Sequence, residues 1–389
     1  MTRRRMRVLH IVQNLNWGGM ERVIADLVTR TDADRFELHL LCLQYLGRFA
    51  EGLDRVAQLH VAKPMSRFSM LNPRGLTATI REIAPDLVHT HSGIWYKASL
   101  AARRAGVGTL VHTEHGRRNP DLWSDRLFDG AAARRTDVVV AVSQRLAEEL
   151  PRALRISNAK IACIPNGIDT EQFKPMADTG AVRRELGLGA STPIVGSIGR
   201  LEPIKAYDQM VEAFSDFARR PTGRDAVLVL AGEGSTREAI AGQIRRLELE
   251  GRVHLLGWRS DIHDLLSSFS LFSMSSRSEG TSISLLEAMS MGIPPIVTDV
   301  GGNAGVLGPS LSSNLVPFGQ PKAMADAWER LLAQSSVRDE SARRARWRVA
   351  TAFGLDAVAT AYEDLYVRLV GRRAGKTDGD VSQLARAST

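Results

Sequence analysis

Residues 271–303 read LFSMSSRSEGTSISLLEAMSMGIPPIVTDVGGN and carry the most informative pattern of the chain. A short apolar strand begins at Leu271 and is followed by a serine-rich loop. A helix is predicted to begin near Thr281 and to end at a Gly-Ile-Pro break at 292–294. A second buried strand and a glycine loop that ends at Asn303 complete the stretch. Short apolar strands that alternate with helices are typical of a parallel sheet buried on both faces.

Two carboxylates bracket the loop and the first turns of this helix. Ser282, Ile283 and Ser284 lie at the expected helix start, where backbone N–H groups lack intrahelical acceptors and the helix dipole favours an anion. Glu279 precedes the helix and can accept hydrogen bonds from sugar hydroxyls, and Glu287 lies about two turns further along. Glutamates at such positions also serve as ordinary caps. Together with the N–H groups, however, the pair suits a sugar nucleotide.

The order of short motifs in this stretch resembles the signature of family 4 of the retaining glycosyltransferases. The motifs are Glu279-Gly280, Glu287-Ala288-Met289, Gly292-Ile293-Pro294 and Gly301-Gly302-Asn303. The resemblance implies the GT-B fold, an α/β fold in which two Rossmann-like domains face each other across a cleft. It also implies donor contacts from Gly280, Thr281, Ser282, Ile283 and Glu287, with Glu279 at the donor sugar.

Arg200 and Lys205 follow the first strand of the second half, and their charges are suited to clamp a diphosphate. The resembled family carries an Arg and a Lys in this loop. Its members normally have glycine after the Lys, where this chain has Ala206. They commonly have a glutamate shortly after Gly-Gly-Asn, where this chain continues Ala304-Gly305-Val306.

Three further positions resemble parts of the family's site. Gly19 lies in the first strand–glycine–helix unit, where a side chain would fill space needed by the substrate. His115 follows a strand and corresponds to the family's active-site histidine, at the transferred sugar or the acceptor. Gly232 and Gly234 form a glycine turn that resembles the one beside the nucleotide, although a plain tight turn explains them equally well.

The domain limits follow from two strand–loop–helix openings. Residues 1–175 are expected to form the acceptor-side Rossmann-like domain and residues 176–352 the domain that binds the nucleotide sugar. A terminal helix at 353–370 is expected to pack back on the first domain, and residues 371–389 to be a disordered tail.

The composition is that of a globular protein with 389 residues, 44% hydrophobic and 24% charged. No apolar run is long enough to span a membrane, and no signal peptide is expected. The two cysteines, Cys42 and Cys163, are expected to be buried free thiols, which favours a cytoplasmic protein. The formal charge of +8 is compatible with weak contact to an anionic membrane at its inner face. No motif for nucleic-acid binding accompanies it.

No metal site is expected. His89, His91, His112 and His115 lie near strand ends, but no cysteine or ordered carboxylate completes a zinc ligand set. Asp32-Ala33-Asp34 is expected to be a turn, and Asp378-Gly379-Asp380 lies in the expected tail.

The predicted activity is transfer of a sugar from a UDP- or GDP-sugar to a hydroxyl of a glycan or lipid-linked acceptor, with retention, in exopolysaccharide or lipopolysaccharide synthesis. The residues expected to act on the reacting groups are His115, Arg200, Lys205 and Glu279. A sugar-nucleotide epimerase and a catalytically silent scaffold of the same fold remain as alternatives, because folds are reused without their chemistry.

Overall fold

The structure is a computed structural model that describes residues 4–16, 18–63, 70–116, 123–373 and 375. The chain divides into two compact units. Unit 1 comprises residues 1–167 and 355–389, and unit 2 comprises residues 168–354. The first division therefore falls a few residues before the expected limit at 175, and the second falls two residues after the expected limit at 352. The chain ends of unit 2 are joined by a bridge between Ile168 and Gly354.

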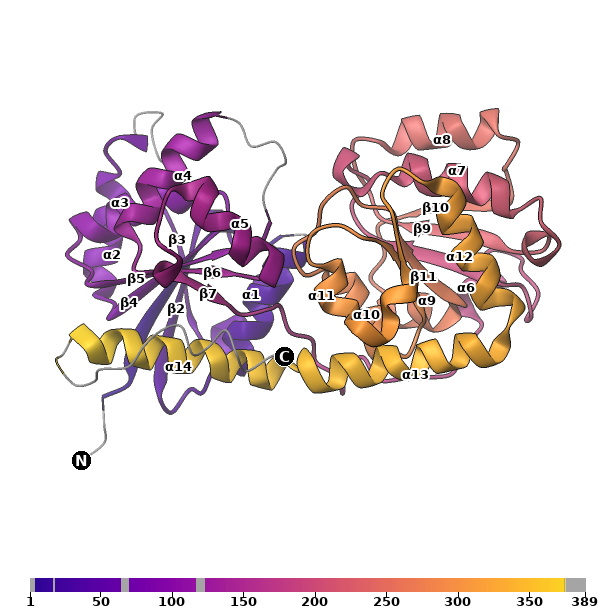
Figure 1. The fold of residues 1–389 in the computed structure, drawn as a ribbon. Coiled ribbons are helices and arrows are strands. Elements are labelled where there is room, and N and C mark those ends of the chain that lie inside the picture. The colour runs from indigo at the N-terminus through magenta and orange to yellow at the C-terminus, as the bar shows by residue number, and fades with distance from the viewer. Residues whose placement is uncertain (1–3, 17, 64–69, 117–122, 374, 376–389) are drawn as a thin grey trace. The chain divides into compact units, whose positions relative to one another are not determined.

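Unit 1 is built on a sheet of seven parallel strands in the order β3-β2-β1-β4-β5-β6-β7 (Figure 1). The strands are β1 Met6–Asn14, β2 Phe36–Tyr45, β3 Gln58–Val61, β4 Leu87–His91, β5 Thr109–Glu114, β6 Val138–Ala141 and β7 Ile161–Cys163. The helices are α1 Gly19–Arg30, α2 Arg74–Ile83, α3 Trp95–Arg104, α4 Trp123–Arg135, α5 Gln144–Leu154 and α14 Leu355–Arg373.

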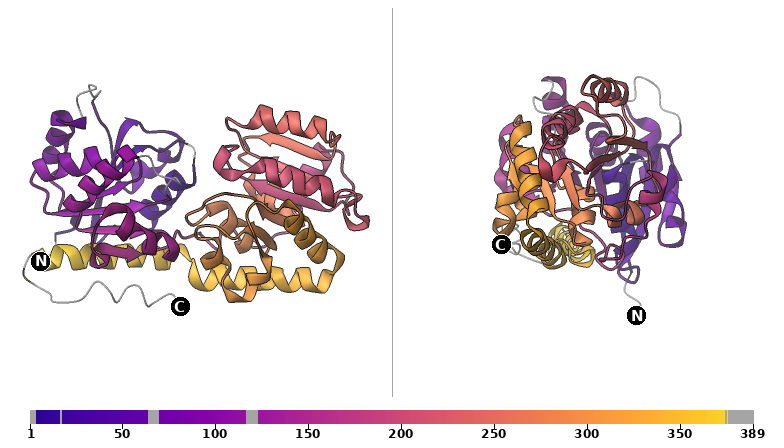
Figure 2. Two further views of the ribbon diagram at one scale, coloured as in Figure 1. Left: turned by 45° about the horizontal axis from the view of Figure 1, so that its top comes forward. Right: turned by 90° about the vertical axis from the view of Figure 1, so that its right-hand side faces the viewer.

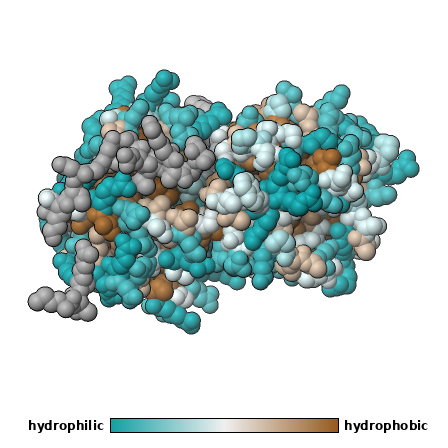
Figure 3. Space-filling view, turned by 60° about the horizontal axis from the view of Figure 1, so that its bottom comes forward, coloured by the Kyte–Doolittle hydropathy of each residue, from teal (hydrophilic) through white to brown (hydrophobic). Residues whose placement is uncertain are grey.

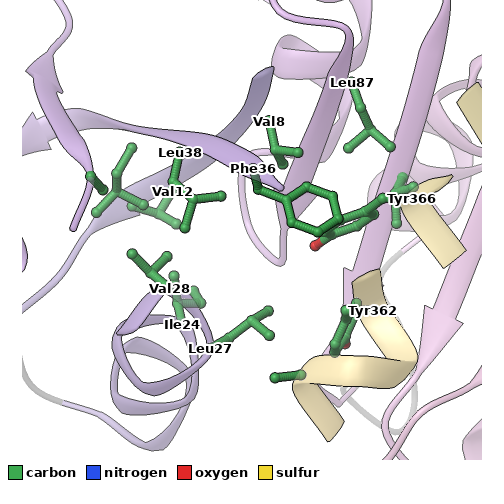
Figure 4. Close-up of a cluster of buried hydrophobic side chains, with 14 of the residues drawn as sticks. Val8, Val12, Ile24, Leu27, Val28, Phe36, Leu38, Leu87, Tyr362 and Tyr366 are labelled. Atoms are coloured by element: carbon green, nitrogen blue, oxygen red, sulfur yellow. The ribbon is translucent and has the colours of Figure 1, made fainter. Parts of the chain in front are cut away.

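The two faces of this sheet are covered by different helices. On one face, α1 and α14 pack on β1 and β2, and Figure 4 shows Ile24, Leu27 and Val28 of α1 pointing toward the strand side chains. Tyr362 and Tyr366 of α14 join the same cluster and are almost completely buried. On the other face, side chains of α2 and α3 pack on Leu9, Ile11 and their neighbours. The last helix of the chain is therefore part of the core of unit 1, as the sequence predicts.

Unit 2 has a sheet of six parallel strands in the order β10-β9-β8-β11-β12-β13. The strands are β8 Ile194–Ile198, β9 Val227–Ala231, β10 Val253–Gly257, β11 Leu271–Met274, β12 Pro295–Thr298 and β13 Leu315–Val316. The helices are α6 Ala181–Glu185, α7 Tyr207–Phe217, α8 Arg237–Arg246, α9 Ile262–Ser268, α10 Ile283–Ser290, α11 Asn303–Leu307, α12 Pro321–Ala333 and α13 Ser335–Ala352. Helices α7, α8 and α12 cover one face, and α6, α9, α10, α11 and α13 cover the other; Figure 2 gives two further views of these layers.

The strand predicted from Leu271 and the strand predicted after the Gly-Ile-Pro break are present as β11 and β12. Two edge strands, β3 and β13, were not predicted from the sequence. Each is short, and the exposed Gln58 and Val61 give β3 no continuous apolar run. The Asp32–Asp34 segment is a turn, in which the Asp34 N–H donates to the Asp32 carboxylate at 2.9 Å. Residues 378–380 and most of the expected tail lie outside the described residues.

The face drawn in Figure 3 is mostly hydrophilic, with hydrophobic residues in scattered patches. Among the described residues, none of the helices combines the length and the apolar character that crossing a bilayer requires. Cys42 is a buried free thiol and Cys163 is a half-buried one. Burial raises the pKa of the Cys42 thiol to about 12 and that of Cys163 to about 11.

Candidate active site

The carboxyl ends of β8 and β11 lie side by side at the centre of the unit 2 sheet. The chain runs outward from this pair in both directions, since β9 and β10 lie beyond β8 and β12 and β13 lie beyond β11. In open parallel sheets, ligands bind beyond the strand ends at such a switch point. The loop after β8 carries Arg200 and Lys205, and the loop after β11 carries Glu279 and leads to Ser282. The fold therefore brings the two predicted clusters together.

An ion pair joins the two loops. The Lys205 ammonium lies 2.6 Å from Oε1 of Glu279, and both side chains are largely buried, at 20% and 9% exposed. Ser276 donates its hydroxyl proton to the same carboxylate oxygen at 2.5 Å. One cation and one hydroxyl thus hold the Glu279 carboxylate beyond the carboxyl end of β11.

Further contacts tie the loops into one layer. The Ser275 hydroxyl donates to the Lys205 carbonyl at 2.9 Å, and the Arg277 N–H donates to the Ile204 carbonyl at 2.8 Å. The position of Glu279 relative to Lys205 is therefore set by the backbones of both loops, as well as by the ion pair. Such rigid support is what a site for a charged substrate needs.

The glycine loop after β12 holds the backbone of Glu279. The Gly302 N–H donates to the Glu279 carbonyl at 3.1 Å. Gly301 has φ +54°, and a Cβ there would overlap that same carbonyl oxygen. Only glycine combines this backbone conformation with such a close approach. The Gly-Gly pair is therefore a direct structural support for Glu279.

Helix α10 begins where the sequence predicts an anion site. Ser282 is its N-cap and accepts from the Leu285 N–H at 3.5 Å, and it also contacts the Ser284 hydroxyl at 3.2 Å. Ile283 opens the helix and is half-buried, and Thr281 before the cap is buried. Glu287 lies one turn inside the helix and is only 8% exposed. The start of α10 thus follows directly on Glu279 and Gly280.

Gly232 and Gly234 have a structural task. A Cβ at Gly232 would overlap the Gly199 carbonyl oxygen, and one at Gly234 would overlap the carbonyl oxygen of Leu201. The Leu201 N–H donates to the Glu233 carbonyl at 2.8 Å. The glycine turn after β9 therefore packs backbone to backbone on the loop that carries Arg200. Its role in donor binding stays a prediction.

Arg200 and Ala206 lie near the two ends of the segment between β8 and α7. Arg200 is exposed and lies near Glu202, whose pKa is lowered first by hydrogen bonds from Ser235 and then by the Arg200 charge. Ala206 has φ +49° and caps α7 in the left-handed region that glycine adopts most readily. The chain thus keeps the backbone conformation of a glycine at the position where it departs from the resembled family.

Gly19 and His115 belong to unit 1. Gly19 is the exposed first residue of α1, directly after β1. His115 follows β5 and is half-buried. Its backbone N–H donates to the Ser92 hydroxyl at 3.1 Å. Nε2 of its ring lies 3.2 Å from Nδ1 of His91. Burial is the main reason that the pKa of His115 is lowered to about 4.

The two halves of the sequence match two profiles of one enzyme class. Residues 17–172 match "Glycosyltransferase Family 4" and residues 178–348 match "Glycosyl transferases group 1". An alpha-D-kanosaminyltransferase of Streptomyces kanamyceticus is 30% identical over 283 residues, which cover 69% of this chain and 72% of the relative. The chain belongs to glycosyltransferase family 4. It is therefore a glycosyltransferase.

Another relative and a solved structure each match nearly the whole chain. The UDP-Gal:alpha-D-GlcNAc-diphosphoundecaprenol alpha-1,3-galactosyltransferase of Escherichia coli is 25% identical over 383 residues, which cover 95% of this chain and 98% of the relative. The solved structure of Anabaena HepE in complex with UDP-glucose has a TM-score of 0.81 and 22% identity, and covers 94% of this chain and 100% of that one. This likeness confirms the predicted GT-B fold.

Two residues of this family 4 chain, Ser276 and His10, were not identified from the sequence. Ser276 was not singled out, because one serine in a serine-rich loop carries no signal of its own. His10 lies in the middle of the apolar strand Met6–Asn14 and contacts His91 across the sheet. A histidine inside a buried parallel strand is unusual, and this was the signal that could have identified it.

Proposed function

We propose that the enzyme transfers a sugar from a UDP- or GDP-sugar to a hydroxyl of a glycan or lipid-linked acceptor, with retention at the anomeric carbon. The observation that carries the proposal is the Lys205–Glu279 ion pair, which joins the loop that also carries Arg200 to the loop that leads into α10. This one layer offers two cations and a helix N-terminus for a diphosphate, and a carboxylate for sugar hydroxyls. Glu287 is assigned to the ribose, and Gly280 to close approach of the donor to the backbone.

In the proposed reaction the bond between the anomeric carbon and the diphosphate oxygen breaks, and a bond from that carbon to the acceptor oxygen forms. Negative charge grows on the leaving diphosphate, and Arg200, Lys205 and the α10 N-terminus stabilise it. Preorganised groups of this kind supply a large part of an enzyme's rate enhancement. The acceptor proton passes to a leaving phosphate oxygen, so that no protein carboxylate acts as the base. His115 donates or accepts one hydrogen bond at a substrate hydroxyl, and Gly19 leaves room for substrate at the first loop.

The relatives support the choice of substrates. The name of the Escherichia coli relative specifies a UDP-sugar donor and a diphosphoundecaprenol-linked acceptor, and Bacillus subtilis EpsF is a putative glycosyltransferase with 28% identity. We assign the enzyme to polysaccharide synthesis, with exopolysaccharide or lipopolysaccharide as the product, and to weak contact with an anionic membrane. The proposed chemistry requires no metal, and turnover in the presence of EDTA tests that part.

The test is release of nucleoside diphosphate from a panel of UDP-, GDP- and ADP-sugars. Wild type is compared with Arg200→Ala and Glu279→Ala, and with Lys322→Ala and Glu250→Ala as controls at exposed positions outside the two loops. Slow release from one donor, lost only in the first two variants, is expected. Conversion of the donor sugar without diphosphate release would identify an epimerase instead. Absence of donor binding across the panel would overturn the proposal.

A further inference from the structure

A row of histidines crosses the sheet of unit 1 from the middle of β1 to the carboxyl ends of β4 and β5. His10 lies on β1, His91 ends β4 and His115 follows β5. Nδ1 of His10 lies 3.3 Å from Nε2 of His91, and Nδ1 of His91 lies 3.2 Å from Nε2 of His115. His10 and His91 are completely or almost completely buried. Each contact therefore joins the Nδ1 atom of one ring to the Nε2 atom of the next.

The two ends of this row have no partner among the described residues. Nε2 of His10 and Nδ1 of His115 are both inaccessible and without a hydrogen bond in the part of the chain that the structure describes. Buried polar atoms without a partner are rare, and each one calls for an explanation. The rings are joined by hydrogen bonds, and the row ends just after β5 on an unsatisfied nitrogen. This arrangement is the one expected where a ligand supplies the missing hydrogen bond.

Burial favours the neutral form of all three rings. Burial lowers the pKa of His10 and of His115 to about 4, and burial together with the neighbouring histidines lowers that of His91 well below its usual value. A neutral imidazole carries one N–H and one bare nitrogen. If His10 donates from Nδ1, then His91 must also carry its proton on Nδ1 and donate to His115, which then carries its own proton on Nδ1. If His115 donates from Nε2, all three rings carry the proton on Nε2.

We propose that His10, His91 and His115 form a coupled chain in which all three rings share one tautomer, and that His91 is the residue that positions His115 and fixes its tautomer. His115 is half-buried, and its unpaired Nδ1 is the end of the chain that a substrate hydroxyl would reach by displacing the atoms that cover it in this structure. A hydroxyl oxygen that accepts from this atom selects the Nδ1–H chain, and a hydroxyl that donates to it selects the Nε2–H chain. The tautomer selected at His115 then determines the tautomer of His10, two strands away.

A metal site at the same place is less consistent with the contacts. His10, His89 and His91 present ring nitrogens within 4.8 Å of one another. However, Nδ1 of His89 lies 2.6 Å from the Tyr366 hydroxyl, and its Nε2 lies 2.7 Å from the hydroxyl of Thr113. Both nitrogens of His89 are thus engaged by the protein, and binding a metal would have to break one of these short hydrogen bonds.

The first experiment observes the histidine ring nitrogens of the full-length protein by NMR at neutral pH. The chain has nine histidines, and single His→Asn variants assign the three signals. The same tautomer on all three rings, without a proton on both nitrogens of any of them, is expected. Mixed tautomers would overturn the chain. A stoichiometric addition of Zn²⁺ should leave the three ring signals in place, and their loss or shift would favour a metal site.

A matched pair of variants tests the positioning role. In His91→Asn the amide stands near the former Nδ1 and can still reach His115, whereas in His91→Gln it stands near the former Nε2 and reaches only His10. His91→Gln should uncouple the tautomer of His115 from that of His10. It should also lower kcat roughly tenfold, about the effect of one lost hydrogen bond to a reacting partner, with the donor KM little changed.

His91→Asn should keep most of the activity, and equal activity in both variants would overturn the positioning role. The kinetic part rests on the proposed function and the NMR part does not. If the wild-type protein shows no transferase activity, the proposed function is therefore refuted. A tautomer shared by all three rings would still establish the coupled histidine chain.

Discussion

The ammonium of Lys205 lies 2.6 Å from the carboxylate of Glu279, although 73 residues separate them in the sequence. One residue belongs to the loop after β8 and the other to the loop after β11, and these are neighbouring strands in the unit 2 sheet. The cation that we assign to the diphosphate is thus hydrogen-bonded to the carboxylate that we assign to the donor sugar. In the proposed function, one donor molecule contacts both groups.

We expect the contributions of Lys205 and Glu279 to be coupled. Lys205→Met and Glu279→Gln should each reduce diphosphate release by roughly 10²-fold or more, the effect of losing one preorganised charged group. The double variant should lose much less than the product of the two effects, because each single change leaves the other group without its partner. A double-mutant cycle on the release rate measures this coupling. Fully multiplicative losses would show that the two residues act independently.

Gly301→Ala should displace the backbone of Glu279 while leaving the chemistry of its side chain unchanged. The new Cβ would overlap the Glu279 carbonyl oxygen, and Gly301 has φ +54°. We expect a loss of stability of about 2 kcal/mol or more and a strong loss of donor turnover. Gly305→Ala is the control, because no atom lies within 4 Å of a Cβ there and the residue is helical. The control should be neutral or slightly stabilising in urea unfolding, and an equal effect of both variants would contradict the assignment.

Two alanines in the left-handed region should respond differently to replacement by glycine. Ala84 ends α2 with φ +49° and is exposed, whereas Ala206 has the same φ and is 1% exposed. Ala84→Gly removes strain at little cost and should stabilise the protein by about 0.5–1 kcal/mol. Ala206→Gly removes the same strain but also a buried methyl group worth about 0.8 kcal/mol, so its effect should be smaller. Urea unfolding of both variants gives the order, and the reverse order would refute the argument.

The buried histidines should make the protein less stable in mild acid. The pKa of His10 is lowered by burial to about 4, so the unfolded chain binds a proton there below about pH 6.5 while the folded chain does not. The stability contribution is therefore complete above pH 6.5 and is lost as pH falls toward 4, by roughly 3 kcal/mol for His10 alone. Tm measured between pH 7 and pH 4 should fall more steeply in wild type than in His10→Asn. Parallel curves would show that His10 titrates normally.

Much of the architecture was open to prediction from local patterns. Short apolar runs such as the one that begins at Leu271 are typical of buried strands, and the glycine, serine and proline signals between them separate strands from helices. Ser282 was placed at a helix start and is the N-cap of α10. The edge strand Gln58–Val61 was missed because its side chains are mixed in character and its strand state depends on pairing with β2.

The candidate site was predictable only in part. The motif order around Glu279 and Glu287 indicated the family, and the loop of Arg200 and Lys205 was found from its charges. The direct bond between Lys205 and Glu279 was not predicted, since nothing in the order of residues says which strands become neighbours. The tasks of Gly232 and Gly301 likewise needed the structure, because each is defined by a backbone that arrives from another part of the chain.

The sequence by itself determined two Rossmann-like halves, the family and the residue types of a site for a charged sugar donor, because these depend on local periodicity and on motifs of fixed spacing. Only the tertiary structure decided which groups touch. It set Lys205 against Glu279 through the strand order β8-β11, and it aligned His10, His91 and His115 across β1, β4 and β5. Hydrogen bonds and ion pairs act over about 3 Å, so their partners are fixed by strand register and burial rather than by distance along the chain.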